Sequence, residues 1–257
     1  MVSPKIFASS DIACKYVADT IITKINQFQP TADKPFVLGL PTGSSPEPVY
    51  KYIREAYSQG KVSFKHVVTF NMDEYVGLGI ESDQSYHYFM YKHLFNHIDI
   101  PKENINILNG HTDNIEAECA RYEQKIKDIG GIHLFLGGIG PNGHIAFNEA
   151  GSSADSVTRQ ISLADSTIKA NSRFFASPEL VPRSALTVGI ATVLASEEVI
   201  ILAFGPAKAK AVKHSLVDEI SSSCPGSFMR LHKHCEFVMD ESAASEYTRR
   251  SETETRL

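Results

Sequence analysis

The sequence of 257 residues predicts a single α/β domain, residues 1–257, with a mostly parallel, Rossmann-like sheet and helices on both faces. Short apolar segments alternate with longer segments of helical period, which is the pattern of parallel strands joined by crossover helices. No internal repeat or shift in composition marks a second domain. Hydrophobic residues make up 42% of the sequence and charged residues 21%, so one large core can form.

Strands and helices alternate in the N-terminal part of the chain. Ser9 offers an N-cap oxygen to an amphipathic helix over residues 12–28. The apolar segments 35–40 and 66–71 predict strands, and the helical spacing within residues 49–57 predicts a helix between them. This order favours a parallel pair of strands.

The same alternation continues through the middle of the chain. Apolar residues at helical spacing predict helices at 85–95 and 115–129, with a short strand at 105–108 between them. The apolar run that starts at Leu134 predicts a buried strand. This strand breaks into a glycine-rich loop that ends at Glu149.

Residues 150–183 have weak periodicity and are rich in Ser, Thr, Ala and Asp. A segment of this length in a compact domain is typical of a lid or a binding segment. The elements predicted beyond it are strands at 185–190 and 198–204, a helix at 207–217 and a strand at 235–239. The polar tail, about residues 241–257, is expected to fray.

The bulk properties narrow the class of protein. A net charge of −5 disfavours a general nucleic-acid surface, so local positive groups must hold any anionic ligand. No Cys-x-x-Cys pair occurs, and we expect buried free thiols of a reducing compartment at Cys14, Cys119, Cys224 and Cys235. Because the sequence has no signal pattern and no apolar run of about 18 residues, we expect a cytoplasmic protein without a membrane partner.

Four predicted loops directly follow strands and contain side chains suited to chemistry. They are residues 41–45, 71–77, 137–149 and 205–208. The carboxyl ends of parallel strands share one edge of a sheet, and ligands of open α/β sheets bind at that edge. We therefore expect the four loops to form one site.

His144 and Glu149 lie five residues apart in the loop 137–149 and can form an imidazole–carboxylate acid/base pair. The alternative is a loop histidine bonded to a backbone carbonyl. The four glycines of this loop favour a functional role, because they let a ligand approach the backbone. Asn142 can orient a ligand hydroxyl but cannot exchange protons.

Neither a dinucleotide nor a metal is expected. Gly138, Gly140 and Gly143 match the spacing of a dinucleotide-binding loop, but no acidic residue ends a strand about 20 residues later. The closest histidines, His232 and His234, lack the four ligands that a structural zinc site usually needs.

The segment Thr42–Ser45 lies between a strand and a helix whose first turn contains Pro46. Backbone N–H groups, hydroxyls and the helix dipole at this place suit a phosphate, and an ordinary serine N-cap is the alternative. Arg173 and Lys208 are two cations that could reach an anion or simply be exposed.

Asp73 and Glu74 directly follow a predicted strand, so only one of the two can face the site. A carboxylate there, among Phe70, Met72 and Tyr75, can have a raised pKa and act as a base. The alternative is that both are solvated turn residues.

Four motifs together resemble those of the glucosamine-6-phosphate deaminase family, and the likeness covers roughly residues 10–240. The motifs are Leu38–Pro46, Val68–Gly77, Gly137–Glu149 and Asn171–Phe175. The resemblance implies that glucosamine 6-phosphate and water give fructose 6-phosphate and ammonia by ring opening, aldose–ketose isomerisation and deamination, without a metal or organic cofactor.

The resemblance also implies roles for individual residues. Asp73 would move a proton between C2 and C1 of the open-chain sugar, and His144, supported by Glu149, would act on the ring oxygen. The residues implied to hold the phosphate are Thr42, Gly43, Ser44, Arg173 and Lys208. Phosphate binding far from C1 and C2 can orient the sugar for proton transfer.

Two positions depart from the family's pattern. Many members have an acid where this chain has Asn142, and an amide there leaves His144 harder to protonate. The allosteric, hexameric members bind N-acetylglucosamine 6-phosphate through a serine, an arginine and a lysine. Ser152 and Arg159 match the first two, but Ile161 replaces the lysine, so we expect weak or absent activation. The sequence leaves a homo-oligomer possible.

Two other functions resemble this one. A 6-phosphogluconolactonase shares the Gly-Pro-x-Gly-His loop, but Ile145–Glu149 and Asn71–Tyr75 favour the deaminase. A sugar-phosphate sensor would need a DNA-binding helix pair, for which the chain has no room before its first strand. Asp73 and His144, which a sensor does not need, are both present.

Overall fold

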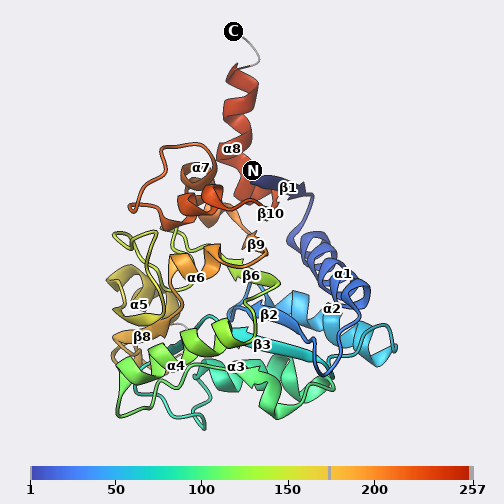
Figure 1. Ribbon diagram of the computed structural model, residues 1–257. Coiled ribbons are helices and arrows are strands. Elements are labelled where there is room, and N and C mark those ends of the chain that lie inside the picture. Colours follow the sequence, from blue (N-terminus) through green and yellow to red (C-terminus); the bar gives the residue numbers. More distant parts are fainter. Residues whose placement is uncertain (1, 173–174, 255–257) are drawn as a thin grey trace.

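The central sheet of the computed structural model, which describes residues 2–172 and 175–254, has seven strands (Figure 1). Their order is β1-β10-β9-β6-β2-β3-β5, and all neighbours are parallel. These strands are β1 (Ser3–Phe7), β2 (Phe36–Leu40), β3 (Val67–Asn71), β5 (Ile105–Asn106), β6 (Leu134–Gly138), β9 (Glu198–Ala203) and β10 (Cys235–Asp240). The predicted α/β class with a mostly parallel sheet is confirmed.

Helices cover both faces of this sheet, as predicted. One face packs against α1 (Ser10–Phe28), α2 (Glu47–Ser58) and α3 (Tyr86–His93). The other packs against α4 (Ile115–Asp128), α6 (Ile190–Leu194), α7 (Ala209–Leu216) and α8 (Glu241–Glu254). Strand β9 shows the alternation that divides the two cores. Its Ile200 and Leu202 join the first cluster, whereas Val199 and Ile201 join the second.

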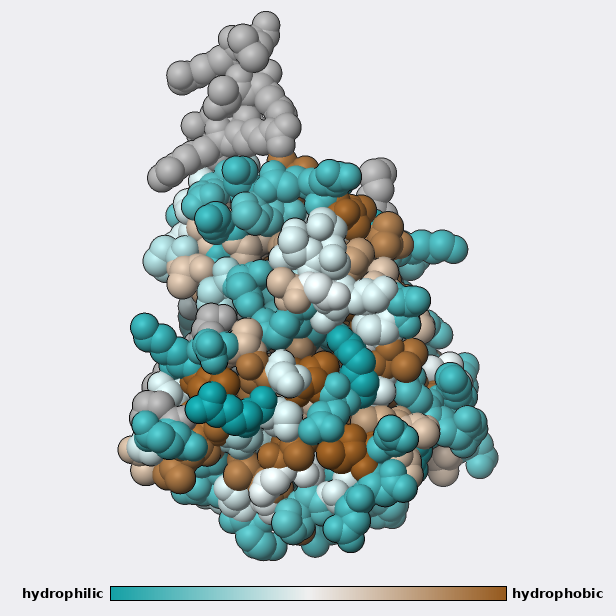
Figure 2. Space-filling view, turned by 90° about the vertical axis from the view of Figure 1, so that its left-hand side faces the viewer, coloured by the Kyte–Doolittle hydropathy of each residue, from teal (hydrophilic) through white to brown (hydrophobic). Residues whose placement is uncertain are grey.

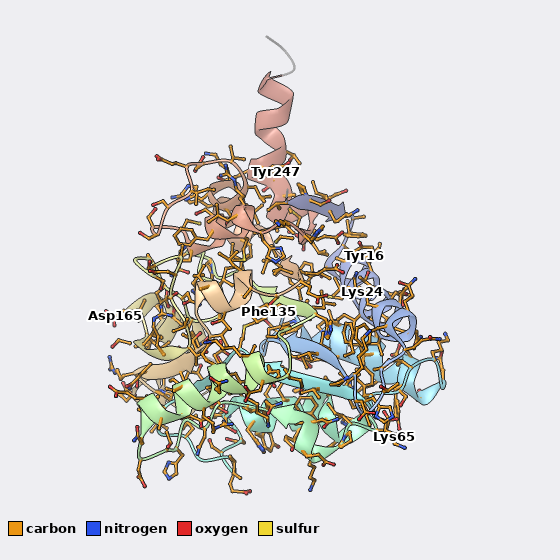
Figure 3. The ribbon with its side chains drawn as sticks, viewed as in Figure 1. Tyr16, Lys24, Lys65, Phe135, Asp165 and Tyr247 are labelled. Atoms are coloured by element: carbon orange, nitrogen blue, oxygen red, sulfur yellow. The ribbon has the colours of Figure 1, made fainter. Side chains whose placement is uncertain are left out.

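Two residues of α1, Tyr16 and Lys24, which Figure 3 labels, make polar contacts that tie this helix to the sheet. The Tyr16 hydroxyl donates to Glu236 of β10 at 3.0 Å, and Lys24 pairs with Glu198 of β9 at 2.6 Å. Phe135 of β6 is buried in the second core. The apolar contacts supply most of the stabilisation, because exposed ion pairs contribute about 0–1 kcal/mol.

A second, antiparallel sheet was not predicted. It has the order β4-β8-β7 and consists of β4 (Asp73–Tyr75), β7 (Arg159–Ser162) and β8 (Ser184–Thr187). The register places Asp73 opposite Thr187. Strand β4 therefore follows β3 in the chain but belongs to the antiparallel sheet. Its pairing with β8 fixes the backbone of Asp73.

The prediction of one strand over residues 185–190 is wrong in its second half, because α6 begins at Ile190. The chain turns at Gly189, where a Cβ would clash with the carbonyl of Ser156. That carbonyl and the Ser156 hydroxyl accept the N–H groups of Ala191 and Ile190 at 2.9 and 3.0 Å. A contact more than thirty residues away thus ends the strand.

The described parts of the segment 150–183, residues 150–172 and 175–183, contain β7, α5 (Asp165–Asn171) and a 3₁₀ turn at Pro178–Leu180. A third apolar cluster joins this segment to the second sheet: Tyr75, Phe147, Leu163, Ile168, Val181 and Ala185. The face of the molecule toward this segment has apolar patches between polar side chains (Figure 2). Val157 and Leu180 are exposed within the segment. Its role as a lid stays a prediction.

The two ends of the chain differ from the expectation. Strand β1 was missed, because its short sequence Ser3–Phe7 contains Pro4 and Lys5 and lies at a sheet edge. The segment after Asp240 was expected to fray but forms α8, whose Ala243 and Ala244 are buried. Asp240 starts this helix by accepting the N–H of Ala243 at 2.8 Å.

The cysteines and the length of the helices bear on the predictions made from composition. All four cysteines are buried and free, as predicted. Within the ranges that the structure describes, no helix combines the length and the apolar character needed to cross a membrane.

Candidate active site

The four predicted loops meet at one edge of the central sheet. The strands that precede them, β3, β2, β6 and β9, are neighbours in the sheet. Leu40 pairs with Asn71 at the ends of β2 and β3, and Gly138 pairs with Leu202 near the ends of β6 and β9. The prediction that topology brings these loops together is confirmed.

Glycines in the loop after β6 make room for the His144 imidazole. Gly140 N–H donates to the His144 carbonyl at 2.9 Å, which folds the loop back on itself. A Cβ at Gly140 would clash with the imidazole, so the ring lies directly over this residue. Gly143 has a φ of +86° and contacts Cys224, which also leaves no space for a side chain. Gly140 therefore makes room for the imidazole, and Gly143 makes room for Cys224.

The predicted pair is formed at the edge of hydrogen-bond distance. His144 Nδ1 lies 3.5 Å from Glu149 Oε2, and the two side chains are 17% and 14% exposed. Asn142 Nδ2 donates to the same oxygen at 2.7 Å, and the Thr167 hydroxyl donates to Oε1. A carboxylate facing Nδ1 favours the tautomer with the proton on Nδ1 and leaves Nε2 for a ligand.

The donors keep Glu149 ionised. Burial acts to raise the pKa of this carboxyl, but hydrogen bonds from His144, Thr167 and Asn142 outweigh it and lower the pKa to about 2. Hydrogen bonds to the charged form of an acid stabilise that form. Glu149 is therefore an anion at neutral pH.

The structure separates the roles of Asp73 and Glu74. Both are buried, at 5% and 3% exposure, so the interpretation as solvated turn residues is wrong. Glu74 accepts the N–H groups of Tyr75, Tyr86 and His87 at 2.8–2.9 Å, which fastens β4 to the first turn of α3. This carboxylate is used by the backbone and is not available to a ligand.

Asp73 is the carboxylate without such donors. Among the described residues, none donates a hydrogen bond to it. Burial, aided by the charge of Glu74, raises the pKa of Asp73 well above its ordinary value. An acid of this kind can bind and release a proton at a carbon atom.

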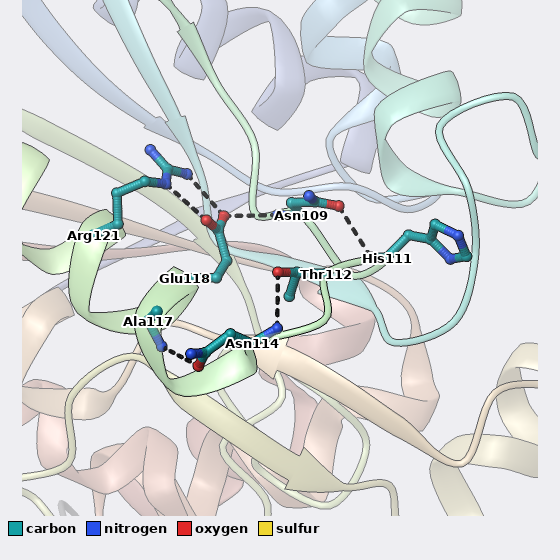
Figure 4. Close-up of polar contacts among 7 residues, drawn as sticks. All are labelled: Asn109, His111, Thr112, Asn114, Ala117, Glu118 and Arg121. Atoms are coloured by element: carbon teal, nitrogen blue, oxygen red, sulfur yellow. Dashed lines mark hydrogen bonds and ion pairs between the residues drawn. The ribbon is translucent and has the colours of Figure 1, made fainter.

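Glu118 of α4 holds a loop that packs beside β4, the strand that contains Asp73; Figure 4 shows the contacts of Glu118. Glu118 accepts the N–H of Asn109 at 2.9 Å and pairs with Arg121 at 2.7 Å. The next residue, Gly110, packs so closely on the Tyr75 carbonyl that a Cβ would clash with it. This loop therefore presses against β4 from the side of α4.

The segment 42–45 connects β2 to the first turn of α2. The N-cap of α2 is Pro46, which makes no side-chain capping bond, so the ordinary serine cap is not formed. Gly43 has a φ of +103° and turns the loop. Thr42 is half-buried and Ser44 is exposed beside it. The first N–H groups of α2 thus lack a serine side chain as partner and suit an anion.

Of the two predicted cations, Lys208 lies among the described residues. Lys208 is half-buried in a 3₁₀ turn, Pro206–Lys208, that follows β9. Gly205 begins this turn, and its N–H donates to both carboxylate oxygens of Asp240, at 3.0 and 3.2 Å. Arg173 lies outside the described residues.

Comparison with known proteins assigns the chain to a family. A model of glucosamine-6-phosphate isomerases/6-phosphogluconolactonase matches residues 8–238. The chain belongs to this family. A glucosamine-6-phosphate deaminase of Phocaeicola vulgatus is 54% identical over 233 residues, which are 90% of this chain and 89% of that protein.

Solved structures agree with membership in the glucosamine-6-phosphate isomerase/6-phosphogluconolactonase family. A monomeric glucosamine-6-phosphate deaminase aligns with a TM-score of 0.91 and 37% identity, over 95% of this chain and 99% of that chain. The 6-phosphogluconolactonase of Trypanosoma cruzi aligns with a TM-score of 0.76 over 95% of this chain and 96% of that chain. Its identity of 19% shows a shared fold alone.

Sequence reasoning gave no role to three residues beside the candidate site. Thr167 contacts Glu149, Asn171 contacts Tyr75 at 2.8 Å, and Glu118 holds the loop beside β4. The partners of Thr167 and Asn171 lie 18 and 96 residues away in the sequence. No local pattern could have indicated those contacts.

Proposed function

We propose that this chain is a glucosamine-6-phosphate deaminase, which converts glucosamine 6-phosphate and water to fructose 6-phosphate and ammonia. One observation carries the proposal. A buried carboxyl of raised pKa, Asp73, follows β3, and an imidazole–carboxylate pair, His144 and Glu149, follows β6. Strand β2 lies between β3 and β6 and leads into the segment 42–45, the proposed phosphate site. The 54% identity to the deaminase of Phocaeicola vulgatus supports the same substrate.

The phosphate group of the substrate fixes the position of the sugar in the site. In this proposal it binds Thr42, Gly43 and Ser44 at the start of α2, and Lys208 and Arg173 neutralise it. Backbone N–H groups and the dipole of α2 favour the dianion. Its attachment at C6 leaves C1 and C2 free to lie near the other two loops, so binding energy orients the reacting carbons.

Ring opening is the task of His144. The C1 hydroxyl loses its proton, the bond between C1 and the ring oxygen breaks, and the ring oxygen gains a proton. Nε2 of His144 can exchange these protons, because Glu149 holds Nδ1. Asn142 belongs to the same group, since its amide holds the carboxylate oxygen that faces the imidazole.

Isomerisation is the task of Asp73. Its carboxylate takes the proton from C2 of the open-chain amino aldehyde while the C1 oxygen gains a proton, which gives an enolamine. The same proton is then given to C1 while the nitrogen loses one, so the aldehyde with an amine becomes an alcohol with a C2 imine. Water then adds to C2 and ammonia leaves. A raised pKa makes the carboxylate a stronger base, and burial excludes solvent protons.

The proposal includes weak or absent activation by N-acetylglucosamine 6-phosphate. A cavity of about 420 Å³ adjoins Glu149 and is lined by Ser152, Arg159 and Ile161. Arg159 already donates to Asn148 at 2.8 Å and to Ser152 at 3.1 Å, and Ile161 offers no charge. A phosphate in this cavity would meet one cation, Arg159, whose guanidinium already donates to protein oxygens. Sigmoidal kinetics relieved by this effector would contradict the proposal.

The place and assembly of the enzyme follow from the same proposal. We expect it in the cytoplasm, where sugar phosphates are available. A monomer is compatible with the likeness to a monomeric deaminase. A homo-oligomer is the alternative, and analytical ultracentrifugation separates the two.

The direct test offers the purified chain two substrates. We expect ammonia and fructose 6-phosphate in equal amounts from glucosamine 6-phosphate, and no hydrolysis of 6-phosphogluconolactone. Lactone hydrolysis without ammonia release would make the chain a lactonase and overturn the proposal. Binding of glucosamine 6-phosphate without turnover would make it a sensor.

A further inference from the structure

Helix α5 contacts both of the loops that hold the reacting groups. Thr167, near its start, bonds to Glu149 of the loop after β6. Asn171, at its end, donates to the hydroxyl of Tyr75 on β4 at 2.8 Å. Because Tyr75 follows Asp73 by two residues in β4, the two side chains point to the same side of the strand.

The contact of Thr167 is specific to one oxygen of the Glu149 carboxylate. The hydroxyl donates to Oε1, whereas Asn142 and His144 lie at Oε2, at 2.7 and 3.5 Å. A carboxylate with separate partners on its two oxygens cannot rotate without losing one of them. The Thr167 bond therefore fixes the orientation of the carboxylate plane relative to the imidazole.

The Thr167 side chain is itself held in place. It is 5% exposed, and its N–H donates to the Ala164 carbonyl at 2.9 Å. The neighbouring Ile168 packs in the apolar cluster with Tyr75 and Phe147. The hydroxyl thus reaches Glu149 only when α5 is packed on the second sheet.

We propose that Thr167 is a positioning residue that aligns Glu149 for ring opening, so that packing of α5 completes the His144–Glu149 pair. This inference rests on the proposed deaminase reaction. When α5 is displaced, Oε1 loses its donor and the carboxylate is free to turn. The catalytic pair then weakens although both of its members remain.

The charged surroundings of Glu149 make the effect measurable. From its own loop it faces His144, and from α5 it faces the neutral Thr167. Asp155 and Arg159 line the adjoining cavity. Loss of a donor to the charged form raises the pKa of a carboxyl, and none of the other groups changes when only the hydroxyl is removed.

The experiment compares Thr167→Val with Thr167→Ser and with a matched control, Thr192→Val. Thr192 is also buried, at 6% exposure, and its hydroxyl also donates to a carboxylate, Glu123, at 2.5 Å. Each variant is assayed for kcat and KM between pH 5 and 9. The Glu149 carboxyl is titrated by NMR in the absence of substrate.

We expect Thr167→Val to lower kcat about tenfold with little change in KM and to raise the Glu149 pKa by about one unit. Thr167→Ser should restore both values, and Thr192→Val should change neither. An unmoved Glu149 titration in Thr167→Val, or an equal loss of kcat in Thr192→Val, would overturn the inference. The titration needs no turnover, so it separates this inference from the proposed reaction, which the ammonia assay tests.

Discussion

A buried carboxyl, Asp73, and a half-buried one, Glu149, have opposite acidities at the same sheet edge. Glu149 lies in a glycine-rich loop, accepts hydrogen bonds from Asn142 and Thr167 and faces the His144 imidazole, and its pKa is about 2. Asp73 lies in a strand with no donor among the described residues, and its pKa is raised well above the ordinary value. Burial opposes ionisation at both positions, so the donors decide the outcome. Glu149 is thus a permanent anion and Asp73 a proton carrier at one sheet edge.

The largest expected effect comes from removing the proton carrier. Asp73→Asn should lower kcat roughly 10³-fold, because the amide cannot take the C2 proton, while glucosamine 6-phosphate still binds. Ammonia release and calorimetric binding measure the two quantities. The exposed Asp113→Asn serves as control and should be unaffected. Turnover within tenfold of the parent enzyme would remove Asp73 from the reaction.

Removing the permanent anion should have a smaller effect. Glu149→Gln keeps the shape but not the charge that orients His144, so kcat should fall about 10- to 100-fold. Glu123→Gln is the matched control, because Glu123 also accepts hydroxyl groups, from Thr158 and Thr192. If both variants lose the same activity, the charge of Glu149 has no special role.

A second carboxylate beside His144 and Glu149, placed at position 142, should shift the pH dependence of kcat. Asn142→Asp replaces the amide that donates to Glu149 with a like charge, which favours protonation of the imidazole. The apparent pKa in the pH–rate profile should rise by about one unit, with kcat changed less than in Glu149→Gln. An unchanged profile would show that the residue at position 142 does not tune the pair.

The smallest expected effects are on stability, and they have opposite signs. Glu149 stabilises the fold above its ordinary pKa of 4.5, and this contribution is lost as the pH falls toward 2. Asp73 destabilises the fold progressively as the pH rises above 3.8, because its folded pKa is higher. At pH 7, Asp73→Asn should raise the free energy of unfolding by about 1–3 kcal/mol, and Glu149→Gln should lower it by a similar amount. Denaturant unfolding measures both, and shifts of the same sign would contradict the comparison.

The contrast between the two carboxyls also marks what the sequence could predict. The apolar runs of β2, β3, β6 and β9 indicated buried parallel strands, and the edge rule then placed four loops together. The positions of Asp73, His144 and Glu149 followed from that rule. Fold class and the meeting of the four loops at one sheet edge were therefore readable from local patterns.

Contacts between distant segments could not be predicted. Strand β4 has three residues, two of them acidic, so nothing in its composition indicates a buried strand. The helix α8 is polar over most of its length, and within its residues 241–248 the buried ones are Ala243 and Ala244. The choice between Asp73 and Glu74 depended on the N–H groups of α3, and the acidity of Glu149 depended on Thr167. These contacts arise from tertiary packing.

A titration of both carboxyls in one sample tests the central claim most directly. Carboxyl signals of Asp73 and Glu149 can be assigned by NMR with Asp73→Asn and Glu149→Gln and followed between pH 2 and 9. The account predicts that Glu149 stays ionised down to a pH of about 2, whereas Asp73 still holds its proton well above 3.8. Titration of both groups together near their ordinary values would contradict it.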